Sequence, residues 1–434
     1  MTSPGERSCC ELLEARFVDI LGHVKAMAIP LSHPTADLKA VARDPAVATG
    51  ISVDGSSVAG YMQVQNSDLH LAPEADTIFR LPYDERRAAA YCTVTQHGGG
   101  GPVAADSRYR LKCMLAEYLT PTQRIEVKPE LEFFLLNGER PADTGHYLDV
   151  RPDNDLSEHL DHCYNALTSM GMPVERVHHE CAPGQVEVEI DYDAILHQAD
   201  RLVSSKLAIR ALARQAGLRA TFMPKPIAGM AGSGMHVHFQ LFDGETNLFG
   251  AEDGMLSETG RHFIAGLLEH APALTAVCNP SVNSYKRLVP NHEAPVYITW
   301  GYRNRSALVR IPWAATPQKA ALELRSPDAT ANVYLALAAM VAAGMDGVRR
   351  GLEPPEERPE NVYQLTPAQR RRLKVRALPE NLRDALEALE RDAVVMEALG
   401  PVLAPKFLSL HREMWDQYLH SVVTDWEREQ YGEY

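Results

Sequence analysis

The chain has 434 residues, of which 45% are hydrophobic and 23% are charged, and it carries a formal net charge of −14. These proportions exclude a disordered chain, and the length predicts two folded domains. The acidic balance argues against a nucleic-acid partner, because the one arginine run, at residues 370–372, lies among polar residues and is typical of a solvated helix face.

Cysteine usage and hydropathy indicate the compartment. The seven cysteines are scattered and include no CxxC pair, which predicts reduced thiols. The N-terminus has no basic-then-apolar signal, and no apolar run reaches membrane-spanning length. We therefore expect a cytoplasmic protein without a membrane partner.

The first hundred residues are predicted to be rich in β-structure. Residues 17–27 alternate around a glycine-containing turn, which predicts a hairpin, and residues 50–57 predict a short strand that runs into a turn. The glycines at residues 98–101 are the best candidate for a linker. We therefore predict an N-terminal domain over residues 1–101 and a larger domain over residues 102–434.

Helices and strands mix in the larger domain. Helical spacing recurs along four segments: residues 155–170, 202–216, 382–389 and 407–431. Strand-like alternation covers three others: residues 186–190, 235–242 and 322–325. The succession predicts the α+β class.

Several predicted strands carry polar residues on one face. Alternation places Glu126, Lys128, Glu130 and Glu132 together, and likewise His236 with His238 and Glu323 with Arg325. For one strand, the simpler interpretation is a face open to water. The repetition over three strands favours a shared polar site instead, and the segment from His178 to Glu187 adds two more carboxylates, Glu180 and Glu187.

Carboxylates with one or two imidazoles suit Mg²⁺ or Mn²⁺. Crowded carboxylates repel one another unless a cation compensates them. The sequence has no CxxC or HExxH signature for zinc, and no GxxxxGK[ST] loop for nucleotide phosphates. Spacing alone therefore predicts a metal-dependent enzyme and no more.

Seven motifs, in fixed order over nearly the whole chain, resemble those of the type I glutamine synthetase family of bacteria and archaea. They lie at residues 54–57, 128–134, 178–187, 225–236, 283–290, 304–306 and 323–328. The resemblance implies a small N-terminal β-grasp domain and a larger C-terminal catalytic domain, in which the polar faces of a curved antiparallel sheet line a funnel.

By this resemblance, two Mg²⁺ or Mn²⁺ ions would be bound. Glu132, Glu180 and Glu187 would hold one ion, and Glu130, His236 and Glu323 the other. ATP would phosphorylate the side-chain carboxylate of L-glutamate, and ammonia or a small amine would then displace phosphate. The assembly would be a homododecamer of two stacked hexameric rings.

The resemblance also implies substrate and nucleotide residues. The glutamate and phosphoryl groups would meet Gly232, Arg287, Arg305 and Arg325. Adenine and the nucleotide would lie near Tyr192, His238 and Arg310. The amine would meet Ser57, Tyr147, Glu180 and the flap residue Glu293, together with Asp54 from a neighbouring subunit.

Three positions depart from the family pattern. Ala231 stands where the family usually has a substrate-loop Asn, and Ala321 where an Arg contacts ATP phosphate, with Lys319 nearby. Gln63 replaces an Arg used for feedback control in one subgroup. Two alternatives to glutamine synthesis therefore stay open: a γ-glutamyl amide ligase for methylamine, ethanolamine or a polyamine, and a non-catalytic paralogue.

The intact Asp54, Ser57 and Glu293 favour ammonia as the acceptor. The complete set of metal ligands argues against a paralogue, because buried unpaired carboxylates are costly to keep without a function.

Overall fold

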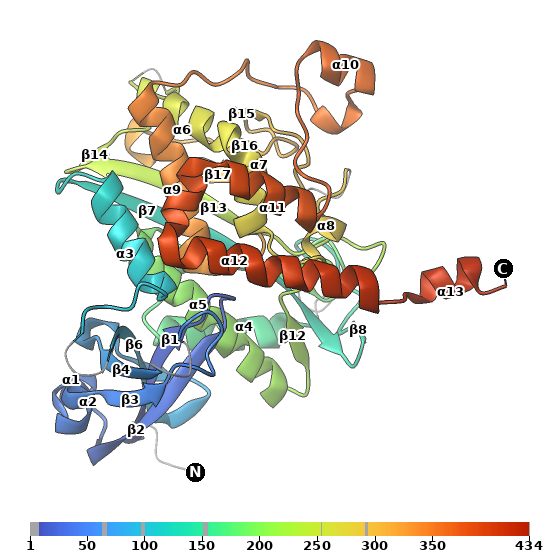
Figure 1. Cartoon of the computed structure of the whole chain (residues 1–434). Helices are drawn as coiled ribbons and strands as arrows, with labels where there is room; N and C mark the ends of the chain where they lie inside the picture. The colour runs from blue at the N-terminus through green and yellow to red at the C-terminus, as the bar shows by residue number, and fades with distance from the viewer. Residues whose placement is uncertain are drawn as a thin grey trace.

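The computed structural model describes residues 8–62, 67–96, 100–150, 155–252, 254–290 and 294–433. A small sheet with two short helices lies beside a larger body of sheet and helices, and a helical arm at the C-terminus projects from that body (Figure 1). Gln63 and Glu293, and the first two glycines of the predicted linker, lie outside the described residues.

The N-terminal sheet is built around one long hairpin. Its strands are β1 (Cys10–Val18), β2 (Val24–Thr35), β3 (Ile51–Asp54), β4 (Asp68–Pro73), β5 (Phe79–Leu81) and β6 (Asp84–Gln96), in the order β2-β1-β6-β4-β3 with β5 paired to β6. The β1–β2 pair confirms the predicted hairpin, with Val18 opposite Val24. The helices α1 (Leu38–Arg43) and α2 (Pro45–Thr49) begin after Asp37 and Asp44, whose carboxylates cap them.

The second sheet has eleven strands and carries the polar faces. Its strands are β7 (Gln123–Asn137), β8 (Arg140–Pro141), β9 (Val174–His179), β10 (Gln185–Ile190), β11 (Asp193–Ala194), β12 (Arg219–Thr221), β13 (Met235–Asp243), β14 (Thr246–Asn247), β15 (Trp300–Tyr302), β16 (Val309–Ile311) and β17 (Leu322–Leu324). The main order is β15-β16-β17-β13-β7-β10-β9. The pairs are antiparallel, as predicted, except that β15 runs parallel to β16.

Helices pack around this sheet. They are α3 (Ser107–Tyr118), α4 (Ser157–Ser169), α5 (Ile195–Gln215), α6 (Glu258–Glu269), α7 (Ala271–Cys278), α8 (Ser284–Arg287), α9 (Val333–Arg350), α10 (Pro367–Arg372), α11 (Leu382–Arg391), α12 (Ala393–Ser421) and α13 (Asp425–Tyr431). Helix α9 is central and buried over most of its length, because its small and apolar residues let α3, α5, α6, α7 and α12 pack against it.

The predicted helical stretch over residues 407–431 is present and contains one break. Helix α12 ends at Ser421, and α13 begins only after Thr424, whose side chain caps it. Thr424 accepts from the amide of Glu427, and the Glu427 carboxylate accepts from Thr424, so a capping box starts a separate helix here. The result is a jointed arm rather than a single rod.

Among the described residues, one helical segment, 393–431, is long and apolar enough to qualify as a membrane span by length and composition. Its apolar side chains have another explanation. Val395, Leu399, Leu403 and Phe407 are buried in the protein core, and Gly400 breaks the helix with a φ of 83°.

Candidate active site

Strand register gathers the polar residues of the large sheet. On β7, Glu130 lies opposite His236 of β13 on one side and Glu189 of β10 on the other, while Glu132 lies opposite Glu187. Because side chains alternate along a strand, these groups all project from the same face. The alternate residues Val127, Leu131 and Phe133 are buried in the core on the opposite face.

This polar face is not open to water, so the simpler interpretation offered for a single strand does not hold. Glu323 is 1% exposed, Glu189 3% and Glu187 6%. The face lines a cavity of about 850 Å³. Its walls combine carboxylates, imidazoles and guanidinium groups, which is a lining suited to a highly charged ligand rather than to an apolar one.

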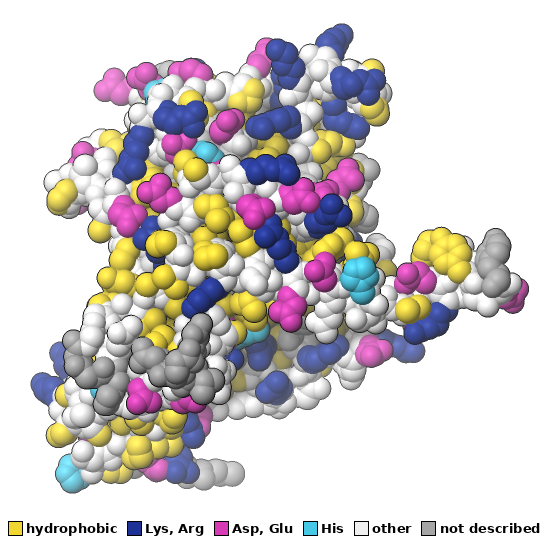
Figure 2. Space-filling model, in the orientation of Figure 1, with side chains coloured by type: hydrophobic (Ala, Val, Ile, Leu, Met, Phe, Trp, Pro, Cys, Tyr) yellow, Lys and Arg dark blue, Asp and Glu magenta, His cyan; other side chains and the backbone are white. Residues whose placement is uncertain are grey.

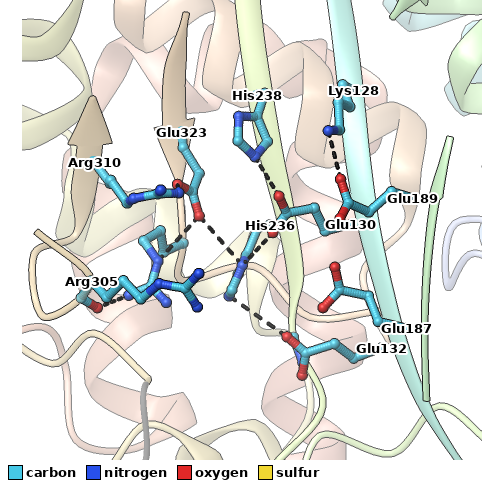
Figure 3. A network of polar contacts seen from close by, with 12 residues as sticks. Lys128, Glu130, Glu132, Glu187, Glu189, His236, His238, Arg305, Arg310 and Glu323 are labelled. Atoms are coloured by element: carbon cyan, nitrogen blue, oxygen red, sulfur yellow. Dashed lines mark hydrogen bonds and ion pairs between the residues drawn. The ribbon is translucent and has the colours of Figure 1, made fainter. Parts of the chain in front are cut away.

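Glu130, His236 and Glu323 form the first group of candidate metal ligands. The Nδ1 atom of His236 is 3.0 Å from a Glu130 oxygen and 3.4 Å from a Glu323 oxygen (Figure 3). One ligand atom from each of the three lies within 4.8 Å of the others. The structure therefore brings together the second predicted metal set.

A second group forms across the cavity and differs in part from its prediction. Glu180 and Glu187 come together as expected, but His178 joins them, with its ring nitrogens 3.6 Å from Glu180 and 3.7 Å from Glu187. Sequence reasoning left His178 out of the ligand set. The signal was available, since His178 and Glu180 are two residues apart at the end of one strand.

Glu132 lies between the two groups. Its carboxylate accepts hydrogen bonds from the Gly234 amide at 2.8 Å and from the Gln185 side chain at 3.2 Å. It also lies 3.8 Å from Nε2 of His236. The carboxylate is thus held in place by fixed donors while one face stays directed at the cavity.

Negative charge is compensated less completely at Glu180 and Glu187 than at Glu130. Burial raises the pKa of Glu187 far above its usual value, and the charges of the neighbouring carboxylates, Glu132 foremost, raise it further. Burial and Glu132 raise the pKa of Glu180 in the same way. Burial also acts to raise the pKa of Glu130, but hydrogen bonds from His236 and His238 outweigh it and lower that pKa below the usual range. The Glu180–Glu187 side therefore has an excess of negative charge that a cation would relieve.

Arginines surround Glu323. Arg310 Nη1 is 2.5 Å from one carboxylate oxygen, and Arg325 Nε is 3.1 Å from the other. Arg310 and Arg325 both line the cavity, and so does the exposed Arg305. The Nε of Arg310 is buried and has no partner among the described residues, so this guanidinium retains a free donor.

One wall of the cavity was only partly predicted from the sequence, which assigned Lys128 to the polar face but not Glu175, Arg176 or Glu189. Lys128 Nζ lies 2.5 Å from Glu189 and 2.6 Å from Glu175, and Arg176 lies 3.1 Å from Glu189. The two cations hold Glu189 beside Glu130 without leaving its charge uncompensated. The alternation of Glu187 and Glu189 along β10 could have shown that both face the site.

Other groups that line the cavity suit an organic ligand. They include His238, Tyr192 and Gln240, together with the loop after β16 that carries Trp313. The Trp313 side chain is 74% exposed. Lys319 and Ala321 also line the cavity, so a lysine is present where the family arginine is absent.

Other predicted site residues do not line this cavity. Asp54 and Ser57 are exposed on β3 and the turn that follows, where Asp54 accepts hydrogen bonds from Ser56. Arg287 is buried, and its guanidinium donates to the carbonyl oxygens of Ser326 and Arg325.

Gly232 lies close to Arg287. A Cβ at Gly232 would approach the Pro224 carbonyl oxygen to 2.5 Å, so only glycine fits there without a shift. The Gly232 carbonyl accepts a hydrogen bond from Gln185, the residue that also bonds Glu132.

Comparison with known proteins agrees with this geometry. Residues 10–97 match the family model for the glutamine synthetase β-grasp domain, and residues 104–431 match that for the glutamine synthetase catalytic domain. The chain is 43% identical to "Glutamine synthetase" of Thermotoga maritima over 88% of this chain and 89% of the relative. It is 42% identical to that of Pyrococcus abyssi over 96% and 95%.

Solved structures agree as well. A structure described as "GmaS/ADP complex-Conformation 1" superposes with a TM-score of 0.86 at 32% identity, covering 98% of this chain and 97% of the other. The ligand-free form of the same protein gives the same values. Since the catalytic-domain model alone matches most of the chain, this protein belongs to the glutamine synthetase family.

Proposed function

We propose that this chain ligates ammonia to the γ-carboxylate of L-glutamate at the expense of ATP, through γ-glutamyl phosphate, and so forms glutamine. The observation that carries the proposal is the pair of carboxylate–imidazole groups facing one cavity, Glu130–His236–Glu323 and His178–Glu180–Glu187. Relatives at 39–43% identity that carry the name glutamine synthetase support the same reaction.

The donor set fits two hard divalent cations, Mg²⁺ or Mn²⁺. Glu130, His236 and Glu323 would hold one, and Glu180 and Glu187 the other, with Glu132 or His178 completing it. Oxygen ligands with one imidazole match the preference of these ions, and the raised pKa of Glu187 indicates a place where a cation is needed. When bound, such ions neutralise and align a transferring phosphoryl group.

The nucleotide would lie where aromatic side chains line the cavity. Tyr192, His238 and Trp313 offer aromatic faces for the adenine base, and Arg310 has an uncommitted Nε donor. Lys319 would stand in for the arginine missing at Ala321, as a point charge instead of a bidentate fork. The ADP named in the related complex fits a nucleotide end of this kind.

Glutamate and its phosphorylated carboxylate would lie between the metal groups and the arginines. Arg305 and Arg325 would bind the phosphoryl oxygens, because a guanidinium donates to them in a rigid fork. Arg287 and Gly232 would shape the end that holds the amino-acid group. Arg287 could bind a substrate directly only by giving up part of its present bonds to backbone carbonyls.

The amine would be bound by Tyr147 and Glu180, together with Asp54 and Ser57 of a neighbouring subunit. Tyr147 contacts the His178 ring edge-on at 5.8 Å, which places it beside Glu180 at the cavity. A carboxylate there would bind ammonium and accept its proton before attack. Glu293 is proposed to cover the acyl phosphate and keep water out.

We further propose a homododecamer of two stacked hexameric rings, with the domain boundary at residue 101 and a cytoplasmic location. The exposed positions of Asp54 and Ser57 support a site shared between subunits. The projecting arm exposes Leu419, Val423 and Trp426, and hydrophobic side chains are visible on it (Figure 2). Removing residues 422–434 should lower the number of subunits per assembly, measured as native mass by light scattering. An unchanged subunit number would contradict a role for the arm.

The cytoplasmic location is supported by the absence of disulfides among the seven cysteines, as expected in a reducing compartment.

The reaction itself is tested by phosphate release. Purified protein with glutamate, ATP and Mg²⁺ should release phosphate with ammonia, and more efficiently than with methylamine, ethanolamine or putrescine. Release only with a larger amine would replace the proposal with a γ-glutamyl amide ligase. Absence of phosphate release with every amine would identify a non-catalytic paralogue.

A further inference from the structure

A buried aspartate–histidine pair lies directly behind the proposed amine site. The side chains of Asp143 and His179 are both fully buried. Nε2 of His179 lies 3.1 and 3.2 Å from the two Asp143 oxygens, and Nδ1 lies 2.7 Å from the carbonyl oxygen of Glu180. Both ring nitrogens are therefore used in fixed bonds, and neither is directed at the cavity.

The Asp143 carboxylate joins two segments of chain. Besides His179, it accepts a hydrogen bond of 2.6 Å from the amide of Gly184, at the far end of the β9–β10 turn. Glu180 belongs to this turn. Gly145 permits the close approach, because a Cβ there would lie 2.6 Å from Nε2 of His179. The segment that leads to Tyr147 is thus tied to the turn that carries Glu180.

Leu148 has a backbone conformation that is unfavourable for a residue with a side chain. Its φ is 62°, in the left-handed region that side chains with a Cβ rarely adopt. Its amide donates to the carbonyl oxygen of His179 at 3.1 Å. Such conformations persist where the surroundings determine them, and they cluster at functional sites. Here the bend places the preceding residue, Tyr147, edge-on against His178.

We propose that Asp143 and His179 are positioning residues that fix Tyr147 and Glu180 at one separation, and that this fixed wall selects ammonia over larger amines. The inference rests on the proposed function, which identifies Tyr147 and Glu180 as amine-site residues. A rigid amine site can exclude the added methyl group of methylamine by steric contact, whereas a flexible site can move to accommodate it.

The test compares two aspartate–histidine pairs, one fully buried and one partly buried. Asp143→Asn keeps the size of the side chain but replaces one acceptor oxygen with a donor group that faces His179 or Gly184. Asp346→Asn is the matched control, since Asp346 lies 3.0 Å from the buried His270 in the helical layer. Asp143→Asn should lower the ammonia-over-methylamine preference in kcat/KM by about tenfold, with the KM for glutamate within about twofold. The control should keep the preference.

A second variant covers the case in which Asp143→Asn fails to fold. Leu148→Gly relieves the left-handed strain, since glycine adopts this region freely, and leaves the Asp143–His179 pair intact. It should fold with an unchanged or higher Tm and should still lose amine preference, because the segment is no longer stiff. Wild-type preference in Leu148→Gly and in folded Asp143→Asn would overturn the proposal.

A structural readout separates this inference from the proposed function. Hydrogen–deuterium exchange over residues 138–150 and 180–185 should rise in Asp143→Asn and stay at the wild-type level in Asp346→Asn. Unchanged exchange in Asp143→Asn would overturn the positioning role, even if the protein ligates no amine. Absence of phosphate release by the wild type with every amine would instead overturn the proposed function.

Discussion

His236 and Glu130 lie directly opposite each other on β13 and β7, and Nδ1 of His236 is 3.0 Å from the Glu130 carboxylate. The other oxygen of Glu130 lies 2.7 Å from Nε2 of His238. One carboxylate thus joins the proposed metal ligand His236 to the nucleotide end of the cavity, where His238 lies. In the proposed reaction, loss of Glu130 would weaken both metal binding and nucleotide binding.

Glu130→Ala should lower phosphate release by at least about a hundredfold, because metal-bound phosphoryl groups draw several kcal/mol of stabilisation from their ions. Glu323→Ala should act alike. Glu126→Gln is the matched control, since Glu126 shares the face of β7 but pairs with Arg124 at 2.8 Å. A Glu130→Ala protein with near wild-type turnover would refute the metal assignment.

The stability gained on metal binding should depend on pH, because Glu180 and Glu187 change protonation state. Their pKa values are raised by burial and neighbouring carboxylates, so without metal the folded state keeps protons that the unfolded chain has lost. Stability of the metal-free protein then falls as the pH rises above the ordinary glutamate value of about 4.3 toward the raised values.

Mn²⁺ should therefore raise the Tm more at pH 8 than at pH 5.5, and its binding should release protons. Calorimetry in buffers of different ionisation enthalpy measures the proton release. Glu187→Gln should reduce it, and equal heats in all buffers for the wild type would contradict the prediction.

Trp313→Ala should raise the KM for ATP by about tenfold, since stacking of a base on an aromatic side chain is worth roughly 1–3 kcal/mol. The KM for glutamate should stay nearly constant, because Trp313 is proposed to contact the base and not the amino acid. Trp313→Phe should restore most of the affinity. ADP should quench tryptophan fluorescence in the wild type and much less in Trp313→Phe; equal quenching would show that the base binds elsewhere.

Asp54→Ala should impair use of ammonia more than formation of γ-glutamyl phosphate. Equal loss of both steps would count against Asp54 as an amine-site residue. If the site is shared between subunits, mixed assemblies of Asp54→Ala and Glu130→Ala chains should regain activity, because some sites then receive neither change. The control is a mixture of the two pure variants that has not exchanged subunits. If the mixed assemblies are as inactive as this control, each site lies within one chain.

His411 should make the protein less stable in mild acid. Its ring is buried in α12 and stacks on Phe407 at 3.9 Å, and burial lowers its pKa to about 4. The unfolded chain takes up this proton first as the pH falls below about 6.5, so the stability present above that value is lost progressively down to pH 4, by up to roughly 3 kcal/mol.

The check is the Tm of wild type and His411→Gln from pH 7.5 to pH 4.5. The Tm of the wild type should fall more steeply below pH 6.5 than that of the variant. Parallel curves would mean that the ring is protonated in the folded protein.

Local sequence determined which residues share a face, because alternation along a strand follows from backbone geometry alone. Glu130, Glu132, His236 and Glu323 could therefore be assigned to polar faces, and the motifs they belong to identified the family. The hairpin at residues 17–27 was equally local, since its register depends on one turn.

Only the tertiary structure decided which faces meet and what else joins them. The pairing of β7 with β10 and β13 links residues more than fifty positions apart, and no local pattern fixes such a register. That register placed His236 opposite Glu130 and Lys128 against Glu189. Tertiary packing also buried Asp143 behind the site with His179. Long-range pairing fixes these contacts because the face opposite must pack in the core, and a slip of one residue would turn every carboxylate inward.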